Sequence, residues 1–432
     1  MRCFVFVLAA LLFVGSIRAE EPAQQEAVDR LIEQLSSSKR VERLDAIEAL
    51  EKLGPEILEL LPPLNTIPDL TARSSLRQIR VTLEREAALR SLEPSKVHWP
   101  ENLTLGEALV MLRDQTGNPI SWIINESALQ QSIETGPREL TFWEAVSRLD
   151  AQFDLVLSEH KTKRELVLSL GDSADSQQYA PRTSGAFLWR LEHITTKPVV
   201  NHPDEELFRV MLSVHCEPRL RPLFMKLKHS QIVMMDEDGN PLKPFTPEAI
   251  VELPWGQSIA PVRLRLDYLV PQDKPPRELT LLMELEVDLA TGTADVEFRE
   301  WELPRESIRK AGVIVTREPL DATPDRLRIP LRLAYESGGP IFESHRNWVY
   351  HNELSLKHGE QTLTPDAPLE LTLEANGVLG LIYTFRKYPA DWKNATLLYR
   401  VPTLLIKTQV RLATDREPLL LKPKLKPKEP VP

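Results

Sequence analysis

The stretch Leu103-Thr-Leu-Gly-Glu-Ala-Leu109 recurs further along the chain as Leu140-Thr-Phe-Trp-Glu-Ala-Val146. In each copy a threonine precedes an apolar pattern of helical spacing, and a glutamate follows the threonine at the third position. That is the arrangement of a capping box, in which both side chains bond backbone N–H groups at the start of a helix. The repeat therefore predicts two helices, with Thr104 and Thr141 as their N-caps.

A strand-like run follows each of these helices, over residues 120–124 and 153–157. We expect a last apolar run, Glu165 to Leu170, to pair with the second of them across the charged turn His160-Lys-Thr-Lys-Arg164. The short run Lys96–Trp99 stands in front. The predicted order is thus strand, helix, strand, helix and hairpin.

This order resembles the small α/β modules on the N-terminal side of bacterial secretins and of some TonB-linked receptors, the short N-terminal (STN) modules. Their signature is an LTLxEAL helix, a strand, a second such helix and a closing hairpin. The resemblance covers residues 95–170. It implies a small βαβ-type module that binds protein partners and carries no chemistry, and it does not imply a secretin channel.

Residues 24–92 show helical periodicity that begins at Val28. A second apolar stripe is expected from Val41 to Leu53, and a last helix over residues 69–90. Gly54-Pro55 ends the second helix, because glycine accepts left-handed geometry there and proline favours the start of the next helix. This order resembles HEAT-type repeats, and ordinary helical hairpins are the alternative. A repeat cannot bury its own apolar face, so the resemblance implies that this segment packs on something else.

Residues 171–182 are polar and without pattern, which is typical of a linker. Beyond them apolar residues alternate, and turn signals such as Gly292 separate short runs. We expect a β-sandwich over residues 183–305, and a second sandwich or a continuation of the first over residues 306–416. The predicted fold class is multi-domain: α, then α/β, then all-β. Expected strands include Phe187–Ile194, Phe208–Cys216, Leu223–Met235, Val262–Val270, Leu279–Leu289, Asp295–Leu303, Arg326–Ala334, Trp348–Leu356 and Leu397–Leu412.

The two halves of the β region resemble each other, which indicates a duplicated unit. Ile232–Pro244 and Leu354–Pro365 share a strand, a turn with glycine, a leucine and a proline. Each half also closes on a similar segment, Glu286–Ala290 in the first and Gln409–Ala413 in the second.

Residues 1–19 have the features of a secretory signal peptide. Arg2 precedes an apolar run, and small residues lead up to a cleavage site after Ala19. The run is short for a membrane span, and an uncleaved anchor is the alternative. At the other end, residues 417–432 alternate lysine with proline, which predicts a flexible tail. We expect an exported protein, secreted or periplasmic and of bacterial origin, without a transmembrane segment in the mature chain.

The chain of 432 residues has a net charge of −10 from 53 basic and 63 acidic residues. Removing Arg2 and Arg18 with the signal makes it −12. This charge argues against nucleic acid as a partner, because nucleic acids bind cationic surfaces. Only Cys216 would remain of the two cysteines, so we expect no disulfide and a buried small side chain there.

Motifs for nucleotide, zinc or nucleophilic chemistry are absent from the sequence. Two groups of histidines were weighed as metal ligands: His193, His202 and His215, and His345, His351 and His358. Their uneven spacing disfavours a site, so we expect no metal and no cofactor. Asp236-Glu-Asp238-Gly-Asn240 is better explained as a hairpin turn than as a calcium loop, because prolines occupy the positions that an EF-hand reserves for glycine and glutamate.

Trp348, Tyr350, His345 and Arg346 form the richest aromatic and polar cluster. Such residues anchor a protein interface or stack on sugars, and core packing is the alternative. We therefore expect a non-enzymatic exported protein that binds or scaffolds protein partners in the cell envelope. The alternative is a carbohydrate-active or other hydrolase using carboxylates on a sandwich face, such as Glu297, Glu300 and Glu302. A lipoprotein-like ligand-binding accessory is a third hypothesis, and the missing lipobox cysteine weakens it.

Overall fold

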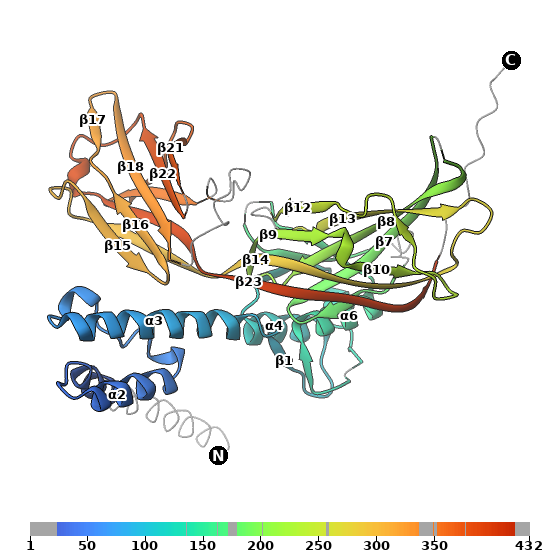
Figure 1. Ribbon diagram of the computed structural model, residues 1–432, viewed down its shortest axis with the longest axis horizontal. Helices are drawn as coiled ribbons and strands as arrows, with labels where there is room; N and C mark the ends of the chain where they lie inside the picture. The colour runs from blue at the N-terminus through green and yellow to red at the C-terminus, as the bar shows by residue number, and fades with distance from the viewer. Residues whose placement is uncertain are drawn as a thin grey trace. The chain divides into compact units, whose positions relative to one another are not determined.

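The protein has an α+β fold with a large β component, and it divides into two compact units, Met1–Arg90 and Ser91–Pro432 (Figure 1). About 24% of the residues are helical and about 47% lie in strands. None of the described helices has the length and apolar character that a membrane crossing requires. The computed structural model describes residues 24–134, 136–161, 163–171, 179–200, 202–255, 259–336, 349, 352–375 and 377–419. The expected signal peptide therefore lies outside the described residues, as do residues 172–178 of the expected linker and 420–432 of the expected tail.

The first unit consists of helices that share one core. Leu35, Leu50 and Leu76 are fully buried in it. The expected stripe from Val41 to Leu53 is wrong at both ends, since Val41 is 68% exposed and Leu53 is 38% exposed. Its buried side chains are those of Ala46 and Leu50. The elements are a helix over residues 24–34, α2 (Arg40–Lys52), the 3-10 turns η1 (Pro55–Ile57) and η2 (Leu64–Thr66), and α3 (Leu70–Ser91).

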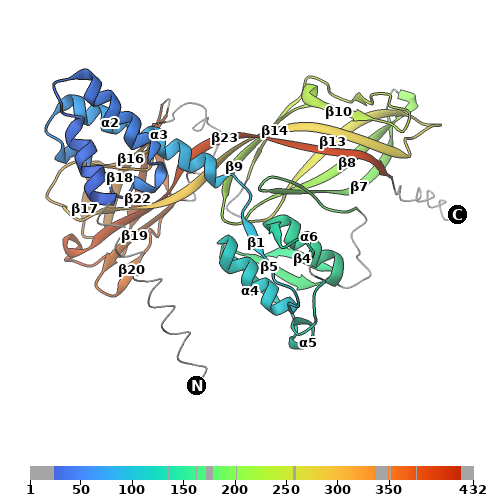
Figure 2. The ribbon, with the colours of Figure 1, turned by 90° about the horizontal axis from the view of Figure 1, so that it is seen from below.

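The second unit begins with a small α/β module (Figure 2). Both predicted capping boxes are present: the hydroxyls of Thr104 and Thr141 accept the N–H groups of Glu107 and Glu144, whose carboxylates accept the threonine N–H groups in return. The expected element order is found, with a short helix and a strand added. The elements are β1 (Lys96–His98), α4 (Leu105–Thr116), β2 (Ile120–Ile123), α5 (Glu126–Leu129), β3 (Glu139–Thr141), α6 (Phe142–Phe153), β4 (Leu155–Glu159) and β5 (Leu166–Leu170).

Two small sheets frame this module. β1 pairs with β3, while β5 lies between β2, which is parallel to it, and β4, which is antiparallel. Phe142, Trp143 and Leu168 are fully buried in the core that these strands share with α4 and α6. The predicted pairing of the last two runs across the charged turn is confirmed.

Three larger sheets make up the rest of the described residues. The strand orders are β11-β13-β8-β7-β6, β12-β9-β14-β23-β19-β20 with β10 beside β14, and β15-β16-β18-β22-β21 with β17 beside β18. The bounds are β6 (Arg182–Ser184), β7 (Phe187–Val199), β8 (His202–Cys216), β9 (Arg221–Lys228), β10 (Ile232–Met235), β11 (Lys243–Pro244), β12 (Ile250–Pro254), β13 (Val262–Pro271), β14 (Glu278–Phe298), β15 (Glu306–Lys310), β16 (Val313–Arg317), β17 (Asp321–Thr323), β18 (Arg326–Tyr335), β19 (Glu353–His358), β20 (Gln361–Leu363), β21 (Glu370–Ala375), β22 (Val378–Phe385) and β23 (Thr396–Pro418).

The sheet that contains β14 and β23 contributes to two separate cores. Met283 and Leu285 of β14 pack with Phe208 of β8 in the first core. Further along, Phe298 of β14 packs with Leu381 of β22 in the second core. β23 runs antiparallel to β14 along nearly its whole length and passes between the same two cores in the opposite direction (Figure 1).

β14 contradicts the prediction of two strands, Leu279–Leu289 and Asp295–Leu303, separated by a turn at Gly292. One strand runs from Glu278 to Phe298. Gly292 instead marks a close approach of two strands, because a Cβ there would lie 2.8 Å from Oγ1 of Thr403 in β23. A glycine inside a strand is typical of such an approach.

In each half of the β region, the strand before the predicted glycine turn lies beside one of the two long strands. Ile232 of β10 lies opposite Met283 of β14, and Leu354 of β19 lies opposite Tyr399 of β23. Glu286 and Gln409, which begin the two similar closing segments, are direct cross-strand neighbours in β14 and β23. The duplication stays a prediction.

Candidate binding groove

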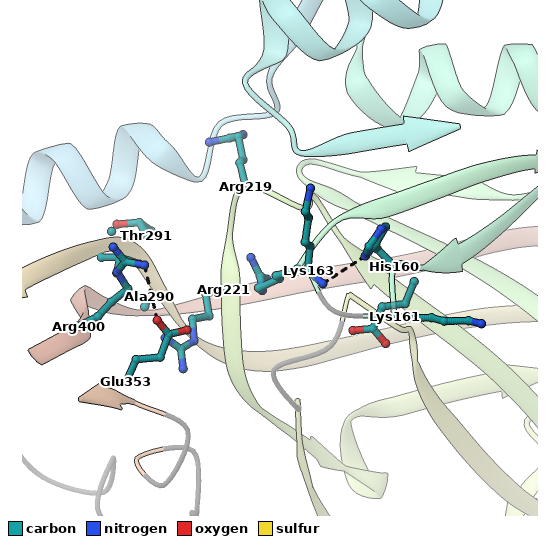
Figure 3. A pocket seen from close by; sticks show the side chains of 13 residues that line it. His160, Lys161, Lys163, Arg219, Arg221, Ala290, Thr291, Glu353 and Arg400 are labelled. Carbon is teal, nitrogen blue, oxygen red and sulfur yellow. Dashed lines mark hydrogen bonds and ion pairs between the residues drawn. The ribbon is translucent and has the colours of Figure 1, made fainter. Parts of the chain in front are cut away.

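A groove with a volume of about 540 Å³ lies in the second unit where the β4–β5 turn faces β9 and β14. Its lining is strongly cationic, within a chain whose net charge is −10. Figure 3 shows its side chains. The lining residues are Glu159, His160, Lys161, Lys163, Arg164, Arg219, Arg221, Ala290, Thr291, Gly292, Thr293, Glu353 and Arg400.

A buried carboxylate joins the two walls of the groove. Glu217 follows β8 and is fully buried. Its carboxylate accepts the backbone N–H of Ser95 at 3.0 Å and the Ser95 hydroxyl at 2.7 Å, and it accepts Nε of Arg219 at 2.5 Å. Asn118 donates to Ser95 Oγ at 2.9 Å and accepts the N–H of Arg219 at 3.0 Å. The network thus connects the segments around β1 and β2 of the module to the chain that leads into β9.

A hydrogen bond, an aromatic contact and an ion pair stabilise the same junction. Nε1 of Trp143 in α6 donates to the carbonyl of Ala186 at 3.0 Å, and its ring lies 5.8 Å from that of His215 in β8. Arg190 of β7 pairs with Asp150 of α6 at 2.9 Å. The residues that follow the expected linker are therefore packed directly against the module.

Arg164 closes the groove from the module side. Its guanidinium donates to the carbonyls of Pro218 at 2.8 Å and Leu220 at 2.5 Å, and its Nε is buried without a hydrogen-bond partner. Desolvation lowers the pKa of Arg164 to about 10, and the nearby charge of Arg221 acts in the same direction. The side chain therefore stays charged at neutral pH, and its hydrogen-bond acceptors are neutral carbonyls.

Arg221 is the first residue of β9 and lies opposite Ala290 of β14. Desolvation lowers the pKa of this half-buried side chain, while the charge of Glu353 opposes that effect. No carboxylate is within ion-pair distance of Arg221 in the described part of the chain. In Figure 3 Arg221 lies between Lys163 and the ion pair that Arg400 forms with Glu353 at 3.5 Å.

The remaining cations differ in how far they are neutralised. Arg400 is held by both carboxylate oxygens of Asp295, at 2.8 and 3.0 Å. Lys161 and Lys163 are exposed, and neither has an ion-pair partner among the described residues. The groove therefore presents guanidinium and ammonium donors, which suit an oxyanion such as a carboxylate.

The residues predicted as an interface, Trp348, Tyr350, His345 and Arg346, lie outside the described residues. Of the histidines weighed as metal ligands, His202 pairs with Glu205, His215 is buried and His358 pairs with Asp391. His193 is exposed, and His345 and His351 are not described. No group of three or more potential ligands is placed to hold a metal ion within the described ranges.

The other predicted features have local explanations. The Asp236 carboxylate accepts the N–H groups of Asp238 and Asn240, so this segment is the hairpin turn preferred above. β14 ends at Phe298, which contradicts the expected strand face carrying Glu300 and Glu302.

Cys216 is buried, as predicted, and burial raises the pKa of its thiol. The groove itself was missed. Its only sequence signal is the charged turn His160-Lys-Thr-Lys-Arg164, which the sequence pattern predicts only as the link between two paired strands.

The sequence matches no protein-family model, and no curated protein is significantly similar to it. The likenesses to STN modules and HEAT repeats therefore stay predictions.

Proposed function

We propose that this chain is a non-enzymatic, exported binding protein that holds a protein partner in the cell envelope at the cationic groove. The observation that carries the proposal is the composition of the groove walls. Two parts of the chain are joined by the buried Glu217 network, and together they surround cations that have no carboxylate partner within the part of the chain that the structure describes. A fixed frame lowers the entropic cost of ordering a site when a partner binds.

The architecture supports the same interpretation. The capping boxes, the parallel β2–β5 pair and the β4–β5 hairpin agree with an STN-like module, a class that binds proteins. Two sheets cover each of the larger cores, as in β-sandwiches, and the first unit has the helical order of HEAT-like segments. The hydrolase alternative has less support, because Glu297 and Glu302 pair with Arg299 and Lys393.

The test places a photo-crosslinking amino acid at Lys163 in the exported chain, expressed in its native host. Lys274, an exposed lysine in the connection between β13 and β14, provides the control position. We expect a discrete crosslinked protein from position 163 and none from position 274. Equal crosslinking at both positions, or no protein adduct from position 163, would contradict the proposal.

A further inference from the structure

We propose that the groove binds an extended acidic peptide segment of the partner protein, whose carboxylates pair with Arg221, Lys161 and Lys163. The inference rests on the proposed function and names the chemistry of the partner at the same site.

The groove has an excess of positive charge, which favours an anionic ligand. Six lysines and arginines line it, against the two glutamates Glu159 and Glu353. Arg219 and Arg400 have carboxylate partners of their own. The remaining cations have no carboxylate in contact among the described residues, and two of them, Arg164 and Arg221, are half-buried arginines. A partly desolvated cation without a counter-charge is unfavourable, so an incoming anion gains more here than at an exposed lysine.

The geometry of the floor favours an extended chain. β9 pairs with β14 only as far as Ala290, opposite Arg221. Among the described strands, β14 continues through Thr291, Gly292 and Thr293 with β23 as its one neighbour. The edge on the β9 side is thus open to a further strand, and an extended peptide adds to such an edge through main-chain hydrogen bonds.

The same charges disfavour a dense polyanion. Glu159 and Glu353 stand on the walls, and the chain as a whole is strongly acidic. A nucleic acid has to place closely spaced phosphates against such a surface, and its affinity depends on many cationic contacts. A peptide with alternating aspartates places its carboxylates on one side of a strand and meets the few unpaired cations.

The experiment measures fluorescence anisotropy of a labelled peptide that alternates aspartate with threonine, added to the mature full-length chain. We expect saturable binding that weakens with added salt, and no binding of the matching asparagine–threonine peptide. Arg221→Gln is expected to weaken binding by about tenfold or more, the size of one charge-assisted hydrogen bond.

Lys161→Gln with Lys163→Gln tests the site in exposed positions, where folding is not at risk. This double variant is expected to weaken binding by about tenfold. The control, Lys243→Gln with Lys274→Gln, makes the same change of charge outside the groove, and we expect an affinity within about twofold of the unchanged chain. Equal affinities of the groove variants and the control would overturn the proposal.

Competition distinguishes other anions. We add three competitors to the peptide complex in turn: inorganic phosphate, a single-stranded oligonucleotide and vesicles of anionic lipid. Unlabelled aspartate peptide is the reference, and concentrations are compared per negative charge. A competitor that displaces the labelled peptide at a lower concentration than the reference does would overturn the proposal. Specific crosslinking at Lys163 without peptide binding would refute this inference alone. Peptide binding without a crosslinked protein would refute the proposed function alone.

Discussion

A single buried carboxylate, Glu217, holds the module against the β region. Its hydrogen bonds reach Ser95, 122 residues earlier, and Arg219, two residues later. Replacing it by glutamine keeps the size of the side chain but removes the charge that pairs with Arg219. We expect Glu217→Gln to lower the free energy of unfolding by about 3 kcal/mol, since a broken buried ion pair leaves an uncompensated charge.

Urea denaturation followed by tryptophan fluorescence measures this change. Glu284→Gln, an exposed position on β14, is the matched control and is expected to change stability by less than about 0.5 kcal/mol. Equal stability of the two variants would show that the network contributes nothing.

His215 gives the junction a dependence on pH. Burial first, and then the charges of Arg190 and Arg263, lower the pKa of His215 from 6.5 to about 4. Between these pH values the unfolded chain binds a proton that the folded chain does not, so the free energy of unfolding decreases as the pH falls. The loss approaches the order of 3 kcal/mol at pH 4.

Carboxylates also titrate in this range, so the measurement is the difference between the unchanged chain and His215→Gln in urea denaturation from pH 7 to pH 4. We expect the unchanged chain to lose more stability than the variant. Parallel curves for the two proteins would contradict a buried neutral histidine.

What the sequence predicts at the scale of residues depends on the distance between partners along the chain. Thr104 and Glu107 are three residues apart, and their capping box is apparent from the pattern. Glu217 and Ser95 belong to segments that only the fold brings together. The cations of the groove come from β9, β23 and the β4–β5 turn, so no local pattern announces them.

At the scale of elements, β14 was the hardest strand to predict, whereas β23 was predicted as one strand. Glycine next to threonines is a common turn signal, and nothing nearby in sequence shows that Gly292 lies against Thr403. The helix end predicted at Gly54 is confirmed, because a positive φ there follows from local geometry.

Gly292→Ala tests the close approach of these strands. The added Cβ would lie 2.8 Å from Thr403 Oγ1, so one of the strands must shift. We expect a loss of about 1–3 kcal/mol in the free energy of unfolding, as for other overpacked sites. Thermal and urea unfolding measure it.

A second variant separates this contact from a general cost of alanine in the strand. Gly292→Ala combined with Thr403→Ala removes the opposing hydroxyl, and we expect it to be more stable than the sum of the two single changes predicts. Simple additivity would contradict the contact.

At the scale of the whole molecule, the expected boundary between a first and a second β segment does not separate two independent sheets. β14 belongs to the first segment but carries Phe298 into the second core, and β23 belongs to the second segment but carries Leu412 into the first. An alternation of apolar and polar residues predicts that a segment is a strand. It does not predict the register in which β14 and β23 pair, because that register depends on which side chains the two cores bury.

We expect the ladder that β14 and β23 share to make the two cores unfold together. Loss of either core would leave half of β14 and half of β23 without cover on one face. We therefore make the same change in each core, Leu285→Ala in the first and Leu397→Ala in the second. Each is expected to lower the free energy of one shared unfolding transition by about 3 kcal/mol, the usual cost of truncating a buried leucine.

Backbone amide hydrogen exchange, measured at increasing urea concentration in β8 for the first core and in β22 for the second, reports separately on the two cores. We expect both signals to change at one urea concentration, and both to shift with either leucine substitution. Independent cores would instead shift only the reporter beside the substitution. That result would mean that β14 and β23 do not pass stability between the cores. It would also mean that the groove floor, to which Gly292 belongs, is less rigid than a fixed binding site requires.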